Sequence, residues 1–401
     1  MYPLLKGLRI VDITTILLGP FATQILGDMG ADVIKIEAPD GDQNRWNPPF
    51  GEPGIGAGFA NNNRNKRSLS LDLKREEAKE ILRRLIGTAD ALVHNMRQDA
   101  LDRLGFGWEA CRALNPRLVY CAALGYGSDG PYSGKPAYDD IIQAAGGIAG
   151  LTWARDGAPA YHPTVTADKV GALHVVYAVL AALLHRERTG GQGQLVEMPM
   201  LEATAAFSLN ENLMGATYED DGALGYHRTM SRNRKPYPTK DGYIALLPYT
   251  TAQWRRVLDA LGREDITSAA WFESNTERSK RADELYAVLA ASLGSRTSVE
   301  WLALFERLDV PCGPVHTLSA LLDDPHLAAV GFFEPCYSTP TPARRALRQP
   351  VLWRGLEREP DRPAPRLGAD SATLLAELGY DAAAIASLAQ AKVVSGADGE
   401  R

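Results

Sequence analysis

Asp168 is the residue whose type and position are best suited to covalent chemistry. It stands in the run Ala167-Asp168-Lys169-Val170-Gly171, immediately before a long apolar segment that predicts a helix. An aspartate there commonly caps the first helical turn by accepting from exposed backbone N–H groups, and spacing alone favours this interpretation. The same helix end would also stabilise an ionised carboxylate and negative charge on an attached acyl group. Asp168 is therefore either a helix cap or a carboxylate nucleophile.

Two basic segments follow adjacent predicted strand ends. Residues 61–74 (NNNRNKRSLSLDLK) form the first, and residues 95–103 (NMRQDALDR) add Arg97 and Arg103 at the next strand end. Phosphate or carboxylate ligands could bind there. Runs of charge are more often solvated surfaces, so both interpretations stay open, although two runs at neighbouring strand ends favour a binding site modestly.

The usual signatures of nucleotide and metal sites are incomplete. The turn LLGP, Leu17 to Pro20, lies where a dinucleotide-binding fold would place G-x-G-x-x-G, but the glycines are missing, so its backbone cannot approach a pyrophosphate closely. Glu37 is then interpreted as a surface acid at a strand end. No histidine spacing or C-x-x-C pair predicts a metal site, and the cysteines are expected to be thiols in a reducing cytosol.

Composition limits the size class and the partners. The chain has 401 residues, 45% of them hydrophobic, which exceeds the usual size of a single core and predicts two domains. The 43 basic and 49 acidic residues give a net charge of -6, which argues against nucleic acid and anionic membranes as partners. The N-terminus lacks a secretory signal, and the apolar run Val170 to Leu184 is shorter than the roughly 20 residues of a membrane span. A cytoplasmic protein is expected.

Alternating strand and helix patterns predict the fold. A strand at 8–13, a helix at 21–29 and a strand at 31–37 form one βαβ unit. Further strands are expected at 68–71, 91–93, 118–123 and 195–198, with helices at 74–87 and 201–214. This order predicts an α/β fold with a doubly wound, mostly parallel, Rossmann-like sheet, whose ligands lie beyond the carboxyl ends of the strands.

Changes in composition predict the domain boundaries. A large domain is expected at 1–200, a linker at 201–225 and a smaller α/β domain at 226–322. A second, proline-rich linker is expected at 323–365, and residues 366–401 are expected to form helices that return to the large domain.

Several short motifs along the chain resemble one enzyme family. They include GLRIVD at 7–12, GADVIKIE at 30–37, NKRS at 65–68, NPRL at 115–118, PCGPV at 311–315 and PRLG at 365–368. Together they resemble class III (CaiB/BaiF-type) CoA-transferases, whose superfamily includes formyl-CoA transferase, carnitine CoA-transferase and alpha-methylacyl-CoA racemase. The resemblance covers nearly the whole chain.

The resemblance implies a reaction and a site. It implies that Asp168 attacks the donor thioester to give a mixed anhydride and then an aspartyl-CoA thioester, so that CoA passes to an acceptor carboxylic acid without a metal or redox cofactor. It also implies an interlocked homodimer. The residues expected to bind CoA are Ile16, Leu71, Lys74, Asn95, Met96, Arg97, Arg103, Leu104 and Lys135, and those expected to bind the acyl substrate are Leu17, Tyr138 and Arg232.

Three departures from the family pattern concern specificity. Leu17 replaces a glutamine of formyl-CoA transferases, and the basic segment 227–235 (HRTMSRNRK) replaces a glycine-rich loop, with Arg232 as a candidate ligand for an acceptor dicarboxylate. Ala38 and Pro136 replace basic residues that hold CoA in some relatives. The candidates to replace those phosphate contacts are Arg64, Arg67, Arg97 and Lys135.

An acyl-CoA racemase is the alternative function. In such an enzyme a histidine and the aspartate exchange the proton α to the thioester. Here Tyr138 occupies the histidine position, and a tyrosine with a reference pKa of about 10 is a poor base, which favours CoA transfer. The sequence identifies neither the donor nor the acceptor.

Overall fold

The chain forms two compact units. The computed structural model describes residues 1–336 and 343–396, so residues 337–342 of the predicted second linker and 397–401 of the predicted C-terminal segment lie outside the described residues. The larger unit comprises Met1–Gly147, Tyr161–Phe207 and the chain from Ala328 onward, and the smaller unit comprises Ile148–Ala160 and Ser208–Leu327.

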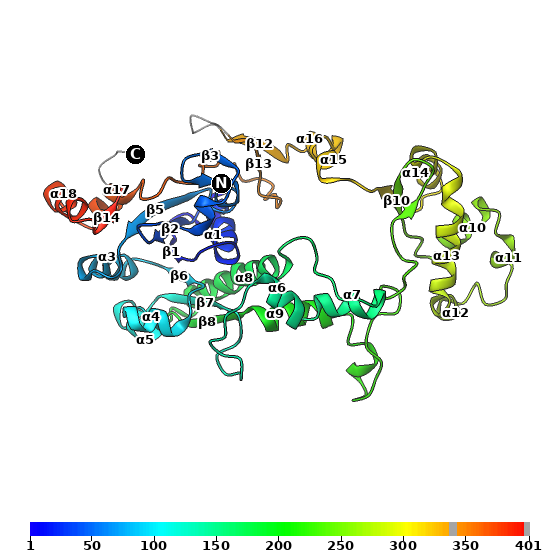
Figure 1. Ribbon diagram of the computed structural model, residues 1–401, viewed down its shortest axis with the longest axis horizontal. Coiled ribbons are helices and arrows are strands. Elements are labelled where there is room, and N and C mark those ends of the chain that lie inside the picture. The colour runs from blue at the N-terminus through cyan, green and yellow to red at the C-terminus, as the bar shows by residue number, and fades with distance from the viewer. Residues whose placement is uncertain (337–342, 397–401) are drawn as a thin grey trace. The chain divides into compact units, whose positions relative to one another are not determined.

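A seven-stranded sheet forms the centre of the larger unit (Figure 1). The strand order is β14-β5-β2-β1-β6-β7-β8, and every neighbouring pair is parallel except β14 with β5. This confirms the predicted mostly parallel α/β sheet. The chain runs outward from β1 through β2 and β5 and then returns to β6, so the switch point of the topology lies between β1 and β6. The strands are β1 (Arg9–Ile13), β2 (Asp32–Glu37), β5 (Lys66–Leu71), β6 (Ala91–His94), β7 (Val119–Leu124), β8 (Leu195–Pro199) and β14 (Val394–Ser395).

Helices cover both faces of this sheet, because successive strand residues point to opposite faces. Ile10 and Val33 belong to the core on one face, whereas Val11 and Ile34 belong to the core on the other. The helices of the first face are α1 (Leu18–Asp28), α6 (Asp139–Ala145), α8 (Thr166–Thr189) and α9 (Met200–Leu209). Those of the second face are α3 (Glu76–Gly87), α4 (Gln98–Leu104), α5 (Trp108–Leu114), α17 (Ser371–Glu377) and α18 (Ala382–Gln390).

Two helices of the larger unit differ from the predicted lengths. Helix α8 has 24 residues rather than the shorter apolar run, and by length and composition alone it could cross a membrane. Half of its most apolar window is buried within the chain, and one side of the helix packs in the same core as α1. Helix α9 ends at Leu209 instead of residue 214, and Met214–Thr217 forms a separate 3-10 turn, η3.

The smaller unit is mainly helical. A three-stranded antiparallel sheet of β9 (Tyr237–Pro238), β10 (Tyr243–Leu246) and β11 (Cys312–Pro314) packs with the helices around one core. Capping boxes at Thr250 and Thr297 begin two of the helices. The helices are α7 (Ile148–Asp156), α10 (Thr251–Ala260), α11 (Glu264–Thr267), α12 (Asn275–Lys280), α13 (Ala282–Ser292), α14 (Ser298–Arg307), α15 (Leu318–Leu322) and the start of α16 (Pro325–Ala329).

Short elements complete the chain. Two pairs of antiparallel strands belong to the larger unit, one of them within the proline-rich segment 323–365. They are β3 (Phe50–Glu52) with β4 (Ile55–Gly56) and β12 (Phe333–Cys336) with β13 (Ala343–Leu347). The remaining elements are α2 (Ala57–Ala60) and the 3-10 turns η1 (Pro3–Leu5), η2 (Gln43–Trp46) and η4 (Leu293–Ser295).

Candidate active site

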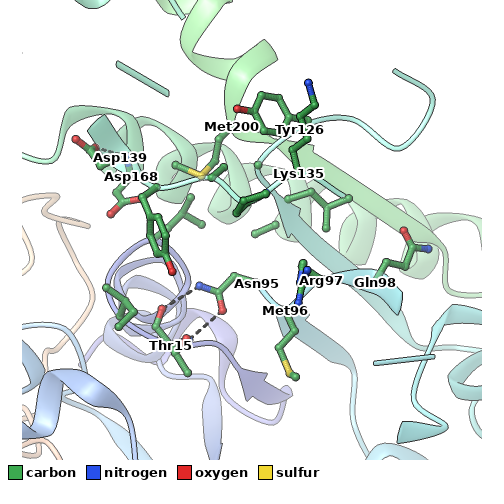
Figure 2. Close-up of a pocket in the computed structure, with 18 of the residues that line it drawn as sticks. Thr15, Asn95, Met96, Arg97, Gln98, Tyr126, Lys135, Asp139, Asp168 and Met200 are labelled. Carbon is green, nitrogen blue, oxygen red and sulfur yellow. Dashed lines mark hydrogen bonds between the residues drawn. The ribbon is translucent and has the colours of Figure 1, made fainter. Parts of the chain in front are cut away.

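A cavity of about 910 Å³ lies in the larger unit (Figure 2). Its walls come from the residues that follow β1, β6 and β7, together with the start of α8. The cavity therefore opens beyond the carboxyl ends of the strands and beside the switch point between β1 and β6, where ligands of doubly wound sheets bind. Asp168 is one of its lining residues.

The turns after β1 and β6 are joined directly. Asn95 Oδ1 accepts a hydrogen bond from the Thr15 N–H at 3.0 Å, and Asn95 Nδ2 donates to the Thr15 carbonyl oxygen at 2.9 Å. Figure 2 shows these two bonds on the floor of the cavity. The Asn95 side chain thus ties the two turns together, and both turns line the cavity.

Asp168 is the third residue of α8 and does not cap it. The helix begins at Thr166 without a side-chain cap, and no described residue donates a hydrogen bond to the Asp168 carboxylate. The relationship is reversed, because the Asp168 N–H donates to Asp139 Oδ1 at 3.0 Å. The predicted capping role is therefore wrong: Asp139 satisfies the N–H group, and the Asp168 side chain faces the cavity instead.

Asp139 is itself held in place. It is 7% exposed, and Gln143 Nε2, one turn later in α6, donates to Asp139 Oδ2 at 2.6 Å. Gln143 also donates to the Thr164 carbonyl oxygen at 3.0 Å and accepts from the His162 N–H at 2.9 Å. These bonds tie α6 to the segment that leads into α8, and so they set where Asp168 stands.

Burial and a neighbouring charge change the acidity of Asp168. Partial burial of the carboxyl group, followed by the negative charge of Asp139, raises the pKa of Asp168 from 3.8 to about 7. Both causes act in the expected direction, because desolvation and a like charge each disfavour the ionised form. A carboxyl group whose pKa lies near neutrality in a cavity is a typical feature of catalytic sites.

The cavity is apolar near Asp168 and carries cations elsewhere. Leu17, Leu18 and Met200 supply apolar lining, and Figure 2 shows Asp168 on the side of Met200, with Arg97 and Gln98 on the opposite side. Lys135 Nζ lies 4.1 Å from the centroid of the Tyr132 ring, which is a cation–π distance. The cavity therefore combines a carboxylate at one end with positive charge that could attract phosphate groups at the other.

Eight of the predicted site residues line this cavity. They come from five separate stretches of sequence and are Ile16, Leu17, Asn95, Met96, Arg97, Lys135, Tyr138 and Asp168. Their common location is a finding of the structure, whereas their individual roles stay predictions.

Five other predicted residues lie outside the lining of this cavity. Leu71 is buried in the core and Leu104 packs against that core. Lys74 is exposed, and Arg103 forms an ion pair with Asp99 at 2.8 Å. Arg232 belongs to the smaller unit, where its Nε donates to the Arg155 carbonyl oxygen at 2.6 Å. The roles proposed for these five residues stay predictions.

Three charged residues have structural partners that the sequence did not indicate. Glu37 is 4% exposed and is paired with Arg45 at 2.7 Å, so the interpretation as a surface acid is wrong. Arg64 is paired with Asp28, and Arg67 with Asp32 and Glu377. Because these guanidinium groups are engaged away from the cavity lining, Arg97 and Lys135 are the better candidates among the four for phosphate contacts.

Sequence reasoning missed Asp139, Gln143 and Asp42. Asp139 follows Tyr138 directly, and two acids at the start of a helix were a signal that a charged group stood there. Its partner Asp168 is 29 residues away, so their pairing required the fold. Within residues 1–336 and 343–396, no group of three or more histidine, cysteine, aspartate or glutamate side chains could hold a metal ion.

Known proteins resemble this chain over most of its length. The profile of CoA-transferase family III matches residues 5–371. The succinate–glutarate CoA-transferase of Agrobacterium fabrum is 33% identical over 387 residues, which covers 94% of this chain and 96% of that protein. The acetyl-CoA:oxalate CoA-transferase of Acetobacter aceti is 32% identical over 377 residues, which covers 92% of this chain and 95% of that protein.

A solved structure has the same fold. A CAIB/BAIF family protein from Brucella suis superposes with a TM-score of 0.79 at 31% identity, over 94% of this chain and 100% of that chain. Sequence profile, relatives and structure agree over nearly the whole length. The chain therefore belongs to CoA-transferase family III, as its sequence motifs predicted.

Proposed function

We propose that this enzyme transfers CoA from an acyl-CoA thioester to a carboxylic acid through covalent intermediates on Asp168. The observation that carries the proposal is the position of Asp168, which lines the cavity at the switch point and whose carboxylate accepts no hydrogen bond from the described residues. A carboxylate without such bonds keeps its lone pairs available for attack. Burial and Asp139 raise the pKa of Asp168 to about 7, which makes its ionised form a stronger nucleophile than an ordinary carboxylate.

The proposed first half-reaction moves CoA onto the enzyme. An oxygen of Asp168 bonds to the thioester carbonyl carbon, and the carbon–sulfur bond breaks to release CoA thiolate. The thiolate then bonds to the Asp168 carbonyl carbon of the mixed anhydride, and the donor acid leaves with the bridging oxygen. An aspartyl-CoA thioester remains.

The second half-reaction repeats these steps with the acceptor. The acceptor carboxylate attacks the aspartyl thioester and expels the thiolate, which then attacks the acceptor carbonyl carbon and releases Asp168. Splitting one exchange into four acyl transfers lowers each barrier, and the apolar side chains of Leu17, Leu18 and Met200 help to exclude water from the anhydride.

We propose that CoA lies between the cationic side of the cavity and Asp168. Arg97 and Lys135 would contact the phosphate groups of CoA. Asn95 and Met96 would lie along the arm of CoA that ends in the thiol. Relatives named for succinate, glutarate and oxalate suggest small acids as substrates. The identity of both acids is open to a screen of thioesters against carboxylic acids.

Trapping by hydroxylamine tests the covalent proposal. With a donor acyl-CoA present, hydroxylamine should convert Asp168 into a hydroxamate that peptide mass spectrometry locates, and Asp168→Asn should lose both trapping and transfer. Asp140→Asn, which alters an exposed acid on the nearby helix α6, is the control and should retain both. Full transfer by Asp168→Asn would refute the proposal.

The racemase alternative predicts a different isotope result. A carboxyl group with a pKa of about 7 could also exchange the proton α to a thioester. In deuterium oxide a racemase would label the α carbon of a branched acyl-CoA without any acceptor acid. Deuterium exchange without CoA transfer would favour the racemase, whereas transfer without exchange would favour the transferase.

We also propose that two chains form an interlocked homodimer. Leu173, Tyr177 and Leu184 on α8 are 55%, 58% and 56% exposed in the single chain. Their spacing places them on one side of the helix, and large apolar side chains gathered in this way favour an interface. A second copy of the chain is the partner that the family resemblance implies.

A further inference from the structure

The turn between β1 and α1 contains a residue in an unfavourable conformation. Ile16 has a φ of 70°, in the left-handed region, and it lines the candidate active site. A β-branched residue seldom adopts this conformation, because its Cβ substituents crowd the backbone. Such a residue persists only where its surroundings hold it, and these positions gather at binding and catalytic sites.

Side chains from other elements hold the backbone of this turn. Both oxygens of Asp42 accept from the Ile16 N–H at 3.2 Å, and the Asn44 side-chain amide donates to the Ile16 carbonyl oxygen. Asn95 binds both backbone groups of Thr15, as described above. Lys35 Nζ donates to the Thr14 carbonyl oxygen at 2.8 Å. The clamp on Ile16 itself therefore consists of Asp42 and Asn44.

Several partners hold the Asp42 carboxylate at this position. It is 2% exposed, and Lys35 Nζ, from the fully buried side chain on β2, donates to it at 3.0 Å. The Asn44 N–H donates to Asp42 Oδ1 at 2.9 Å, and the Asp42 N–H donates to Glu37 Oε1 at 3.0 Å. A buried carboxylate with a cationic partner and a fixed backbone cannot turn away, so its bond to Ile16 is preorganised.

We propose that Asp42 is a positioning residue for acyl-CoA binding, because its carboxylate holds Ile16 in the left-handed conformation that shapes the cavity wall. The inference rests on the proposed function, since CoA is taken as the ligand of this cavity. Without the clamp, Ile16 would relax to a negative φ and displace Thr15 and Leu17 from the wall. The turn would then be competent to bind for only a fraction of the time.

Binding of free CoA tests the proposal without any chemistry at Asp168. Titration calorimetry of Asp42→Asn should give a CoA dissociation constant about tenfold above that of the wild type, because a smaller competent fraction weakens apparent affinity in proportion. The KM for acyl-CoA should rise by a similar factor while kcat changes less. Asn44→Ala removes only the Asn44 half of the clamp and leaves Asp42 paired with Lys35, so it should weaken binding by about threefold.

Glycine at position 16 separates positioning from general damage. Glycine adopts a positive φ without penalty, so Asp42→Asn and Asn44→Ala should each weaken CoA binding by less than about twofold in an Ile16→Gly background. Equal losses in both backgrounds would overturn the proposal. If Asp42→Asn does not fold, the comparison of Asn44→Ala in the wild-type and Ile16→Gly backgrounds tests the proposal by itself.

A second buried ion pair supplies the control. Asp28 lies at the other end of α1, is 1% exposed and is paired with Arg64. Asp28→Asn should lower the melting temperature but leave the CoA dissociation constant unchanged, and an equal loss of CoA binding would overturn the role of Asp42. Failure of the wild type to bind CoA would instead refute the proposed function.

Discussion

Two carboxyl groups from different helices meet at the start of α8. Asp139 accepts the Asp168 N–H, and its charge contributes to the raised pKa of the Asp168 carboxyl group. Asp139 thus both fixes the position of the Asp168 backbone and helps to raise the pKa of the Asp168 carboxyl group. Tyr138 precedes Asp139 in the sequence, but its side chain is exposed. The buried Asp139 side chain is the one that accepts the hydrogen bond from the Asp168 N–H.

The pH dependence of the reaction should report this pair. The proposed attack requires ionised Asp168, so kcat/KM should rise with pH through about 7, to which burial and the charge of Asp139 raise the pKa of Asp168. Asp139→Asn removes one negative charge, so the pKa of Asp168 should fall. The rise of kcat/KM with pH should therefore begin at lower pH. A pH–rate profile of both proteins measures the shift. Asp140→Asn should leave the pH dependence of kcat/KM unchanged. An unchanged pH dependence in Asp139→Asn would contradict the influence of Asp139 on the pKa of Asp168.

At the scale of elements, the start of α1 is packed closely against the end of β1. A Cβ added to Gly19 would lie 2.3 Å from Thr14 Cβ, and the Thr14 hydroxyl is bound to the Asp12 carboxylate. Glycine is required here by the close approach of the two elements. The N-terminus of α1 and the turn that lines the cavity therefore depend on the same small residue.

Gly19→Ala should disturb both stability and binding. The added methyl group has no space, and overpacking of this kind costs about 2 kcal/mol of the free energy of unfolding. Denaturant unfolding and CoA titration measure the two effects. Gly87→Ala, at the end of α3 with open space around the new Cβ, is the control and should change stability by less than about 0.5 kcal/mol. Equal effects at both positions would contradict the packing argument.

Local patterns predicted the elements that repeat and missed those that depend on distant partners. The parallel strands were predictable because buried strands are short apolar runs separated by helical patterns. The two-residue strand β14 was not, because its strand character comes only from pairing with β5, more than 300 residues earlier. The sequence motifs made it possible to predict the eight residues that line the cavity. The Asp139–Asp168 bond and the Asp42 clamp could not be predicted, because they arise from tertiary packing.

At the scale of the whole molecule, the exposed apolar side chains on α8 support the prediction that the chain forms a dimer. Analytical ultracentrifugation should give the mass of two chains, and Leu173→Lys combined with Leu184→Lys should lower the dimer fraction, because both side chains would be charged in an apolar interface. Val299→Lys, an exposed apolar position on α14, is the matched control.

An interlocked dimer is predicted to differ from a side-by-side dimer in how fast it exchanges subunits. Chains that thread through each other cannot separate without unfolding, so tagged and untagged dimers should exchange subunits only after denaturation and refolding. Rapid exchange in native buffer would show a simple side-by-side dimer, and a monomer mass at micromolar concentration would refute the dimer altogether.

The most direct test of the central claim follows an oxygen atom. If Asp168 carries the acyl groups, an acceptor acid labelled with the heavy oxygen isotope leaves one of its carboxyl oxygens on Asp168 in each turnover. Peptide mass spectrometry after turnover with donor acyl-CoA should find the label in the peptide that contains Asp168, and omission of the donor should abolish it. Complete CoA transfer with an unlabelled Asp168 would contradict the covalent mechanism.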